Sequence, residues 1–78
     1  MNKESVFEII KEIFVEVVPS MKTINIQMDD TFKKHGINSI ERMEINMLLL
    51  EETERDIPRV ELLKAGTLGE LAIIICEN

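Results

Sequence analysis

One hydroxyl in this sequence stands where a glycine-bearing loop gives way to an apparent helix. It is Ser39, in the stretch KKHGINSIERMEINMLLLEE. Catalysis by this serine is poorly supported, because the strained elbow G-x-S-x-G is absent and the local run is GINSI. His35, the only histidine, lies four residues earlier in the same loop and is expected to be a solvated loop residue. No aspartate is placed by sequence to orient it, so the residues name no catalytic base for Ser39.

The other residues capable of chemistry are few. Cys76 is the only cysteine, so it cannot form an internal disulfide, and we expect it to pack as a small apolar residue. Asp29, Asp30 and Glu41 could attract a divalent cation, but no EF-hand loop surrounds them. There is no Cys/His ligand spacing and no glycine-rich phosphate loop. The sequence therefore predicts no metal site.

Composition narrows the class of protein. The 78 residues are 45% hydrophobic and 31% charged, which is typical of one folded domain spanning 1–78. The net charge of −6 argues against nucleic-acid binding and suits basic partner proteins, although it could serve solubility alone. The apolar run from Leu71 to Cys76 is far too short to span a membrane. We expect a cytoplasmic protein, because a single thiol suits a reducing compartment.

Helical periodicity accounts for most of the chain. Apolar residues recur at spacings of three and four from Asn2 to about Val18, which predicts an amphipathic helix ended by Pro19. A second helix is predicted from Ile40 to about Glu54, with Asn38 or Ser39 as its N-cap and Glu41 in its first turn.

The remaining segments suggest two further helices and a long loop. Val60 to Leu63 fits a short helical turn, and Thr67 with Glu70 has the spacing of a capping box for a last helix. Residues 21–38 are predicted to be a long loop, pinned to the core by Ile24, Ile26, Met28 and an inward-facing Phe32. Long helix, loop, helix, short turn and helix predict an all-α bundle.

The second helix carries two apolar stripes on a helical wheel. One stripe contains Ile45, Leu48 and Leu49, and the other contains Ile40, Met43, Met47 and Leu50. Glu44 and Glu51 border the second stripe. One stripe suffices to seat a helix, so the second is a candidate partner-binding surface that adaptable methionines would suit. The alternative is that both stripes belong to the core.

At HGINSIERMEI the sequence resembles the acyl and peptidyl carrier proteins, whose G-x-D-S-[LI] motif opens their second helix. The resemblance runs along nearly the whole chain, including DDTFKKHGINS and Ile57-Pro58. It implies a four-helix bundle with three longer helices and a short third one. The usual Asp is Asn38 here, which keeps the capping role without the charge. Asn46 and Thr53 also stand where apolar residues are common.

The resemblance also implies a function. Ser39 would carry a covalent 4′-phosphopantetheine arm, derived from coenzyme A and attached by a phosphopantetheinyl transferase. The protein itself would then be a monomeric carrier with no catalytic residue. Ile40, Met43, Glu44 and Met47 would meet the partners, with Glu51 on the same acidic rim. The implied partners are acyltransferases, ketosynthases or HMG-CoA-synthase-like enzymes, and no nucleic acid.

A narrower likeness concerns the pathway. NSIERMEI followed by IPRVELLKAGTLGEL is similar to free-standing donor carriers of bacterial polyketide β-branching cassettes, which present an acetyl-type thioester to an HMG-CoA-synthase-like enzyme. The alternative is a carrier for fatty-acid synthesis or amino-acid loading. Two other classes stay open from the residues alone: an acidic helical module that binds a partner helix without modification, and a small hydrolase that uses Ser39.

Overall fold

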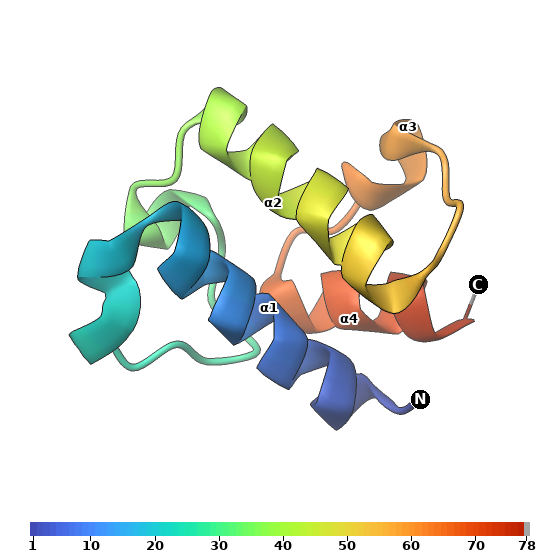
Figure 1. Ribbon diagram of the computed structural model, residues 1–78, viewed down its shortest axis with the longest axis horizontal. Helices are drawn as coiled ribbons and strands as arrows, with labels where there is room; N and C mark the ends of the chain where they lie inside the picture. Colours follow the sequence, from blue (N-terminus) through green and yellow to red (C-terminus); the bar gives the residue numbers. More distant parts are fainter. Residues whose placement is uncertain (78) are drawn as a thin grey trace.

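The computed structural model describes residues 1–77, and Asn78, the last residue of the expected domain, lies outside them. This part of the chain holds four α-helices and no strand, which confirms the all-α prediction (Figure 1). The helices are α1 (Lys3–Val17), α2 (Ser39–Thr53), α3 (Arg59–Leu62) and α4 (Leu68–Glu77), and two 3₁₀ helices, η1 (Pro19–Thr23) and η2 (Lys33–His35), interrupt the segment predicted as one long loop. As predicted, the third α-helix is the short one.

The first helix begins and ends where local chemistry dictates. The Asn2 side chain accepts a hydrogen bond from the Ser5 N–H, and the Ser5 side chain accepts one from the Asn2 N–H, so two amides of the first turn have partners. At the other end Pro19 begins η1, and the Val18 N–H closes the last turn on Phe14. This helix packs against both α2 and α4.

The core is one continuous cluster that all four α-helices and the long loop supply. Its largest fully buried side chains include Phe14, Ile45 and Leu71. Burying side chains of this size supplies roughly 1.5–3 kcal/mol each, which is the main driving force for a chain this short. Cys76, as predicted, is half-buried and packs against this cluster.

The loop between α1 and α2 is anchored by some of the predicted residues only. Ile26 and Phe32 are buried, and Met28 is half-buried against the core. The prediction for Ile24 was wrong, because its side chain is 46% exposed. The 3₁₀ turn of η1 ends at Thr23, so Ile24 leaves that turn on the solvent side before the chain reaches the core.

The loop also supplies hydrogen bonds to the start of α4. The N–H groups of Leu68 and Gly69 donate to the carbonyls of Asp30 and Met28, over 2.9 and 2.7 Å. A Cβ on Gly69 would lie 3.1 Å from the Met28 oxygen, so glycine permits this close approach. These bonds partner amides that an isolated helix would leave free, and they fix the loop that leads to Ser39.

Helices α2 and α3 frame one side of the molecule. Figure 1 shows α2 running above α1 and α4, with α3 to the side of its second half. The short α3 contacts α4. The start of α2 is left at the edge of the fold, where the loop from η2 delivers it.

Candidate functional site

The turn into α2 is built from a glycine and a reciprocal cap. Gly36 has φ of +69°, a left-handed conformation that glycine adopts without steric cost. The Asn38 Oδ1 then accepts from the Glu41 N–H at 2.8 Å, and the Glu41 Oε1 accepts from the Asn38 N–H at 3.0 Å. This is a capping box, and it resolves the choice left open by the sequence: Asn38 is the N-cap.

Ser39 is therefore the first residue of the helix and takes no part in its cap. Its side chain is exposed, and the helix begins one residue earlier than the sequence indicated. The hydroxyl lies at the positive end of a 15-residue helix, where a phosphate group is favoured. Nothing in the fold depends on this oxygen for capping, so it is available for chemistry.

The prediction that His35 is a solvated loop residue was wrong. Its side chain is only 7% exposed, and its Nε2 lies 2.8 Å from the carboxylate of Asp30. The ring also packs edge-on against Phe14, with centroids 6.2 Å apart. Asp30 lies five residues before His35, across the η2 turn, so only the folded loop brings the two together. The imidazole is used to hold the loop, which argues against a role as base for the exposed Ser39.

Asp30 is the centre of a group of hydrogen bonds that holds this loop. Its carboxylate, one of three named above as able to attract a cation, is occupied by these bonds. The Lys34 ammonium and the Gln27 N–H donate to it at 2.8 Å each, and His35 completes the set. The Lys34 bond first, then the Gln27 and His35 bonds, hold the pKa of Asp30 well below its ordinary value. Among residues 1–77 no group of three or more His, Cys, Asp or Glu is arranged to hold a metal ion.

The lowered pKa gives a prediction about acid stability. A carboxyl whose pKa is lower in the folded state stabilises the fold fully above its unfolded pKa, about 3.9, and loses this effect as the pH falls toward the folded pKa. We expect Asp30→Asn to lower the free energy of unfolding at pH 6, and the difference from wild type to shrink steadily below about pH 4. Urea denaturation at several pH values measures both.

Asp29→Asn is the matched control, because Asp29 is the exposed neighbour of Asp30. It removes the same charge without touching the Asp30 bonds and is expected to change stability little. Equal effects of the two variants at pH 6 would show that the Asp30 bonds do not hold the loop.

The two stripes of α2 differ in exposure, which decides between the alternatives left open above. Ile45 and Leu49 are fully buried, whereas Ile40, Met43 and Met47 are 77%, 47% and 46% exposed. Leu48 and Leu50 are half-buried at the edges of the core. The second stripe is thus mainly a surface. Glu44 and Glu51, predicted to border it, are exposed.

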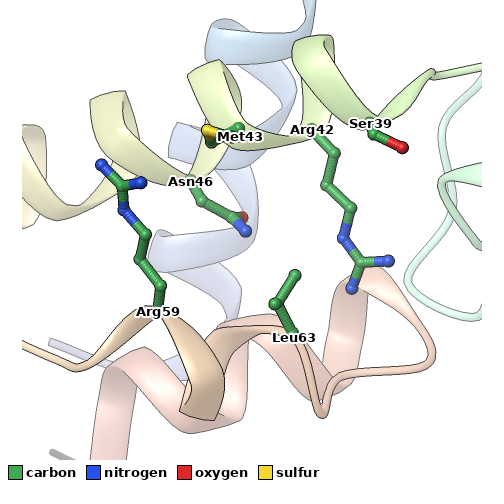
Figure 2. A pocket seen from close by; sticks show the side chains of 6 residues that line it. All are labelled: Ser39, Arg42, Met43, Asn46, Arg59 and Leu63. Carbon is green, nitrogen blue, oxygen red and sulfur yellow. The ribbon is translucent and has the colours of Figure 1, made fainter.

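The α3 helix extends this surface in a way the sequence did not show. Val60 of this helix and Leu63, which follows its last residue, are 62% and 57% exposed. A pocket of about 360 Å³ lies between the two helices, and Figure 2 shows its lining. Its walls are formed by Ser39, Arg42, Met43, Asn46, Arg59 and Leu63.

Part of this pocket could have been read from spacing. Ser39, Arg42 and Asn46 are three and four residues apart, so they share one face of a helix. The contribution of Arg59 and Leu63 could not, because no sequence pattern sets how α3 lies against α2. Arg42 and Asn46 form the polar wall of the pocket, but neither was predicted as a site residue. Both stand at positions that an apolar stripe would have filled, so no polar surface was predicted there.

Comparison with known proteins agrees with this geometry. The profile of the family described as "Phosphopantetheine attachment site" matches residues 8–75. The chain belongs to this family of phosphopantetheine-binding carriers. The carrier is 32% identical to the polyketide biosynthesis acyl carrier protein AcpK of Bacillus subtilis (strain 168), over all of this chain and 95% of that protein. No helix within residues 1–77 is long and apolar enough to cross a membrane.

A solved structure also matches this chain in three dimensions. It is the crystal structure of the HMG synthase of the curacin biosynthetic pathway in complex with an acetyl-donor acyl carrier protein. The matched chain of that complex is 38% identical to this carrier, each chain covers the other completely, and the TM-score is 0.94. The predicted carrier fold is thereby confirmed.

The residues of this carrier fit the prosthetic group of its family. A 4′-phosphopantetheine group supplies a thiol at the end of a long arm, on which acyl groups are held as thioesters. The arm needs an unhindered hydroxyl, and an exposed serine at the start of α2 provides one. The pocket beside Ser39 adds apolar and polar surface along which such an arm could lie.

Proposed function

We propose that Ser39 is the attachment point for 4′-phosphopantetheine and that the protein is a carrier without catalytic activity of its own. The exposed hydroxyl at the first position of α2, in a chain of this family, is the observation that carries the proposal. A phosphopantetheinyl transferase performs the attachment, so Ser39 needs no neighbouring base. Asn38 supports the site by ordering the first turn of the helix, through its bond to the Glu41 N–H.

The direct test is intact mass before and after incubation with coenzyme A and a promiscuous phosphopantetheinyl transferase. We expect a gain of one phosphopantetheinyl group, and fragmentation of the modified peptide should place it on Ser39. The unmodified interaction module considered above predicts no gain. A protein that stays unmodified with several transferases of different origin would contradict the proposal.

We further propose that the acyl group is an acetyl-type donor used in polyketide β-branching. Support comes from the 38% identity and TM-score of 0.94 to a chain of the complex between an HMG synthase and an acetyl-donor carrier. The relationship to a polyketide carrier of Bacillus subtilis points the same way. An HMG-CoA-synthase-like enzyme would then be the main partner, with an acyltransferase or ketosynthase acting earlier on the cargo.

A transfer assay distinguishes this role from the alternatives of fatty-acid synthesis and amino-acid loading. The carrier is loaded with an acetyl group and incubated with an HMG-CoA-synthase-like enzyme, or with a fatty-acid ketosynthase. We expect the acetyl group to move to the HMG-CoA-synthase-like enzyme much faster. Faster transfer to the ketosynthase, or efficient loading with an aminoacyl group, would overturn the β-branching assignment and leave the carrier function intact.

The partner surface we propose joins the exposed stripe of α2 to α3. Ile40, Met43 and Met47 form its apolar centre, and Leu63 at the end of α3, which lines the same pocket as Met43, continues it. Methionine side chains adapt to differently shaped partners, which suits a carrier that must meet several enzymes in turn. We propose that the protein works as a monomer in the cytoplasm, where reducing conditions keep the arm's thiol free.

Charge reversal at the rim should slow delivery to partners. Glu44 and Glu51 are exposed, and isolated surface charges contribute little to stability. In a chain of net charge −6 they can still steer encounters with a basic enzyme surface. We expect the double variant Glu44→Lys, Glu51→Lys to lower the rate of acyl transfer about tenfold at low salt, with a smaller effect at high salt.

A matched control has the same change of net charge on another helix. Glu12 and Glu16 are exposed on α1, so Glu12→Lys, Glu16→Lys tests whether total charge alone matters. We expect the control to retain most of the transfer rate. Equal slowing by both double variants, or none by either at low salt, would remove Glu44 and Glu51 from the partner surface.

A further inference from the structure

Two buried polar atoms in the wall of the pocket lack a hydrogen-bond partner. They are Arg42 Nε, a donor, and Asn46 Oδ1, an acceptor. Buried donors and acceptors are almost always paired, so such an atom requires an explanation. These two lie four residues apart on α2, which places them on the same face of the helix. Both residues line the pocket that begins at Ser39.

Arg42 cannot easily turn away to find another partner. Its Nη2 donates to the Ala65 carbonyl at 3.2 Å, and its guanidinium lies over the Phe32 ring, 4.6 Å from the centroid. These contacts hold the far end of the side chain between α2 and the segment before α4. The Nε–H is therefore fixed along the pocket wall, with no acceptor supplied by residues 1–77.

Asn46 is the second unusual feature of this wall. Asn46 is 5% exposed, and Figure 2 shows its side chain projecting into the space between Arg42 and Arg59. An apolar residue at this position would avoid the cost of burying an amide. Residues that break the local rule in this way often mark functional positions.

The chemistry of the wall matches an amide-bearing chain. Met43 and Leu63 supply apolar surface, Arg42 offers one donor, and Asn46 offers one acceptor. The 4′-phosphopantetheine arm contains two secondary amides, each with one C=O and one N–H, separated by short aliphatic segments. An arm that starts at Ser39 begins at the rim of this pocket.

We propose that the pocket between α2 and α3 is a resting site for the arm itself, rather than a site for its cargo. An amide carbonyl of the arm accepts a hydrogen bond from Arg42 Nε, and an amide N–H of the arm donates one to Asn46 Oδ1. Both atoms are covered in the structure, so side chains of the pocket wall move to admit the arm. The inference rests on the proposed attachment at Ser39.

The test uses the modified protein with an isotope-labelled arm, observed by NMR. Mass spectrometry first shows whether the arm is on Ser39, so failure of attachment is distinguished from failure of the resting site. We expect nuclear Overhauser contacts from the arm's amide protons to the side chains of Arg42 and Asn46. The amide proton that bonds to Asn46 should exchange with solvent about five- to tenfold more slowly than the same proton of free pantetheine, the factor that one hydrogen bond provides.

Variants separate the polar contacts from general proximity. Asn46→Leu keeps the volume but removes the acceptor, so it should bring the exchange rate of the bonded amide proton close to that of free pantetheine. Arg42→Met removes the donor and keeps an apolar stem, so it should weaken the nuclear Overhauser contacts of the arm and lower the protection only in part. Ile73→Leu, exposed on α4 and outside the pocket lining, is the control and should leave the rate unchanged. Circular dichroism checks that each variant is folded, and the wild-type contacts decide the question even if one is not.

Three results would overturn the resting site. An attached arm without contacts to α2 or α3, and with the exchange rate of free pantetheine, would show that it swings freely. Contacts that appear only after acylation, and only from the acyl carbons, would make this a cargo pocket. A direct Arg42–Asn46 hydrogen bond that persists unchanged when the arm is added would show that the two groups partner each other.

Discussion

Replacement of Ser39 by alanine is expected to abolish phosphopantetheinylation while leaving the fold intact. The hydroxyl is the proposed attachment atom, and the N-cap of α2 is the neighbouring Asn38. Loss of the Ser39 oxygen therefore removes no capping bond, and alanine is the residue most favourable to a helix. Intact mass after incubation with coenzyme A and a transferase should show no gain for the variant, against one group for wild type.

The other serines provide controls for this experiment. Ser20 is exposed in η1, and Ser20→Ala should be modified as fast as wild type. Circular dichroism and the melting temperature should be the same for wild type and Ser39→Ala, so loss of modification cannot be attributed to unfolding. A mass gain that persists in Ser39→Ala would place the attachment on another residue and refute the proposed site.

Truncation of Phe14 should have the largest effect on stability. Phe14 is fully buried and packs against Phe32, with ring centroids 5.6 Å apart, and against His35. Phe→Ala changes in protein cores cost about 3–5 kcal/mol. A hydrophobic core in a domain below 80 residues rarely supplies more than about 5 kcal/mol. We therefore expect Phe14→Ala to be largely unfolded at 25 °C, measured by urea denaturation and circular dichroism.

The consequence for function follows from where Phe14 points. Its ring packs against Phe32 and His35 of the loop between α1 and α2, and that loop leads directly to Ser39. Phe14→Leu retains most of the buried volume and should lose less stability and remain a substrate for the transferase. A cost below about 1 kcal/mol for Phe14→Ala would mean that neighbouring side chains close the cavity, against the usual behaviour of tight cores.

The α2 helix shows how far local rules reach. Its start and its cap follow from contacts between residues no more than four apart. The Asn38 and Glu41 side chains find each other's backbone amides within one turn, so the sequence already contained the capping box. The exposure of Met43 and Met47 was decided by the fold, because the periodicity of α2 was equally compatible with both stripes lying in the core.

The loop before α2 shows where such rules end. Ile24 and Ile26 read as equivalent anchors, yet the chain path after η1 buries one and exposes the other. His35 read as solvated, yet its ring lies between Asp30 and Phe14. The partners in these contacts come from different elements or across a turn, and the path of an irregular segment is decided by every contact it makes at once.

The sequence by itself determined the helices, the hydroxyl at the start of the second, and the acidic surface beside it, because propensity, capping and periodicity act over a single turn. Only the tertiary structure decided that α3 would close a pocket beside Ser39, that Arg42 would reach Ala65, and that Asn46 would face this pocket without a partner for its oxygen. The physical reason is distance along the chain. Packing of helices joined by irregular segments depends on the fit of whole surfaces, which no local pattern encodes.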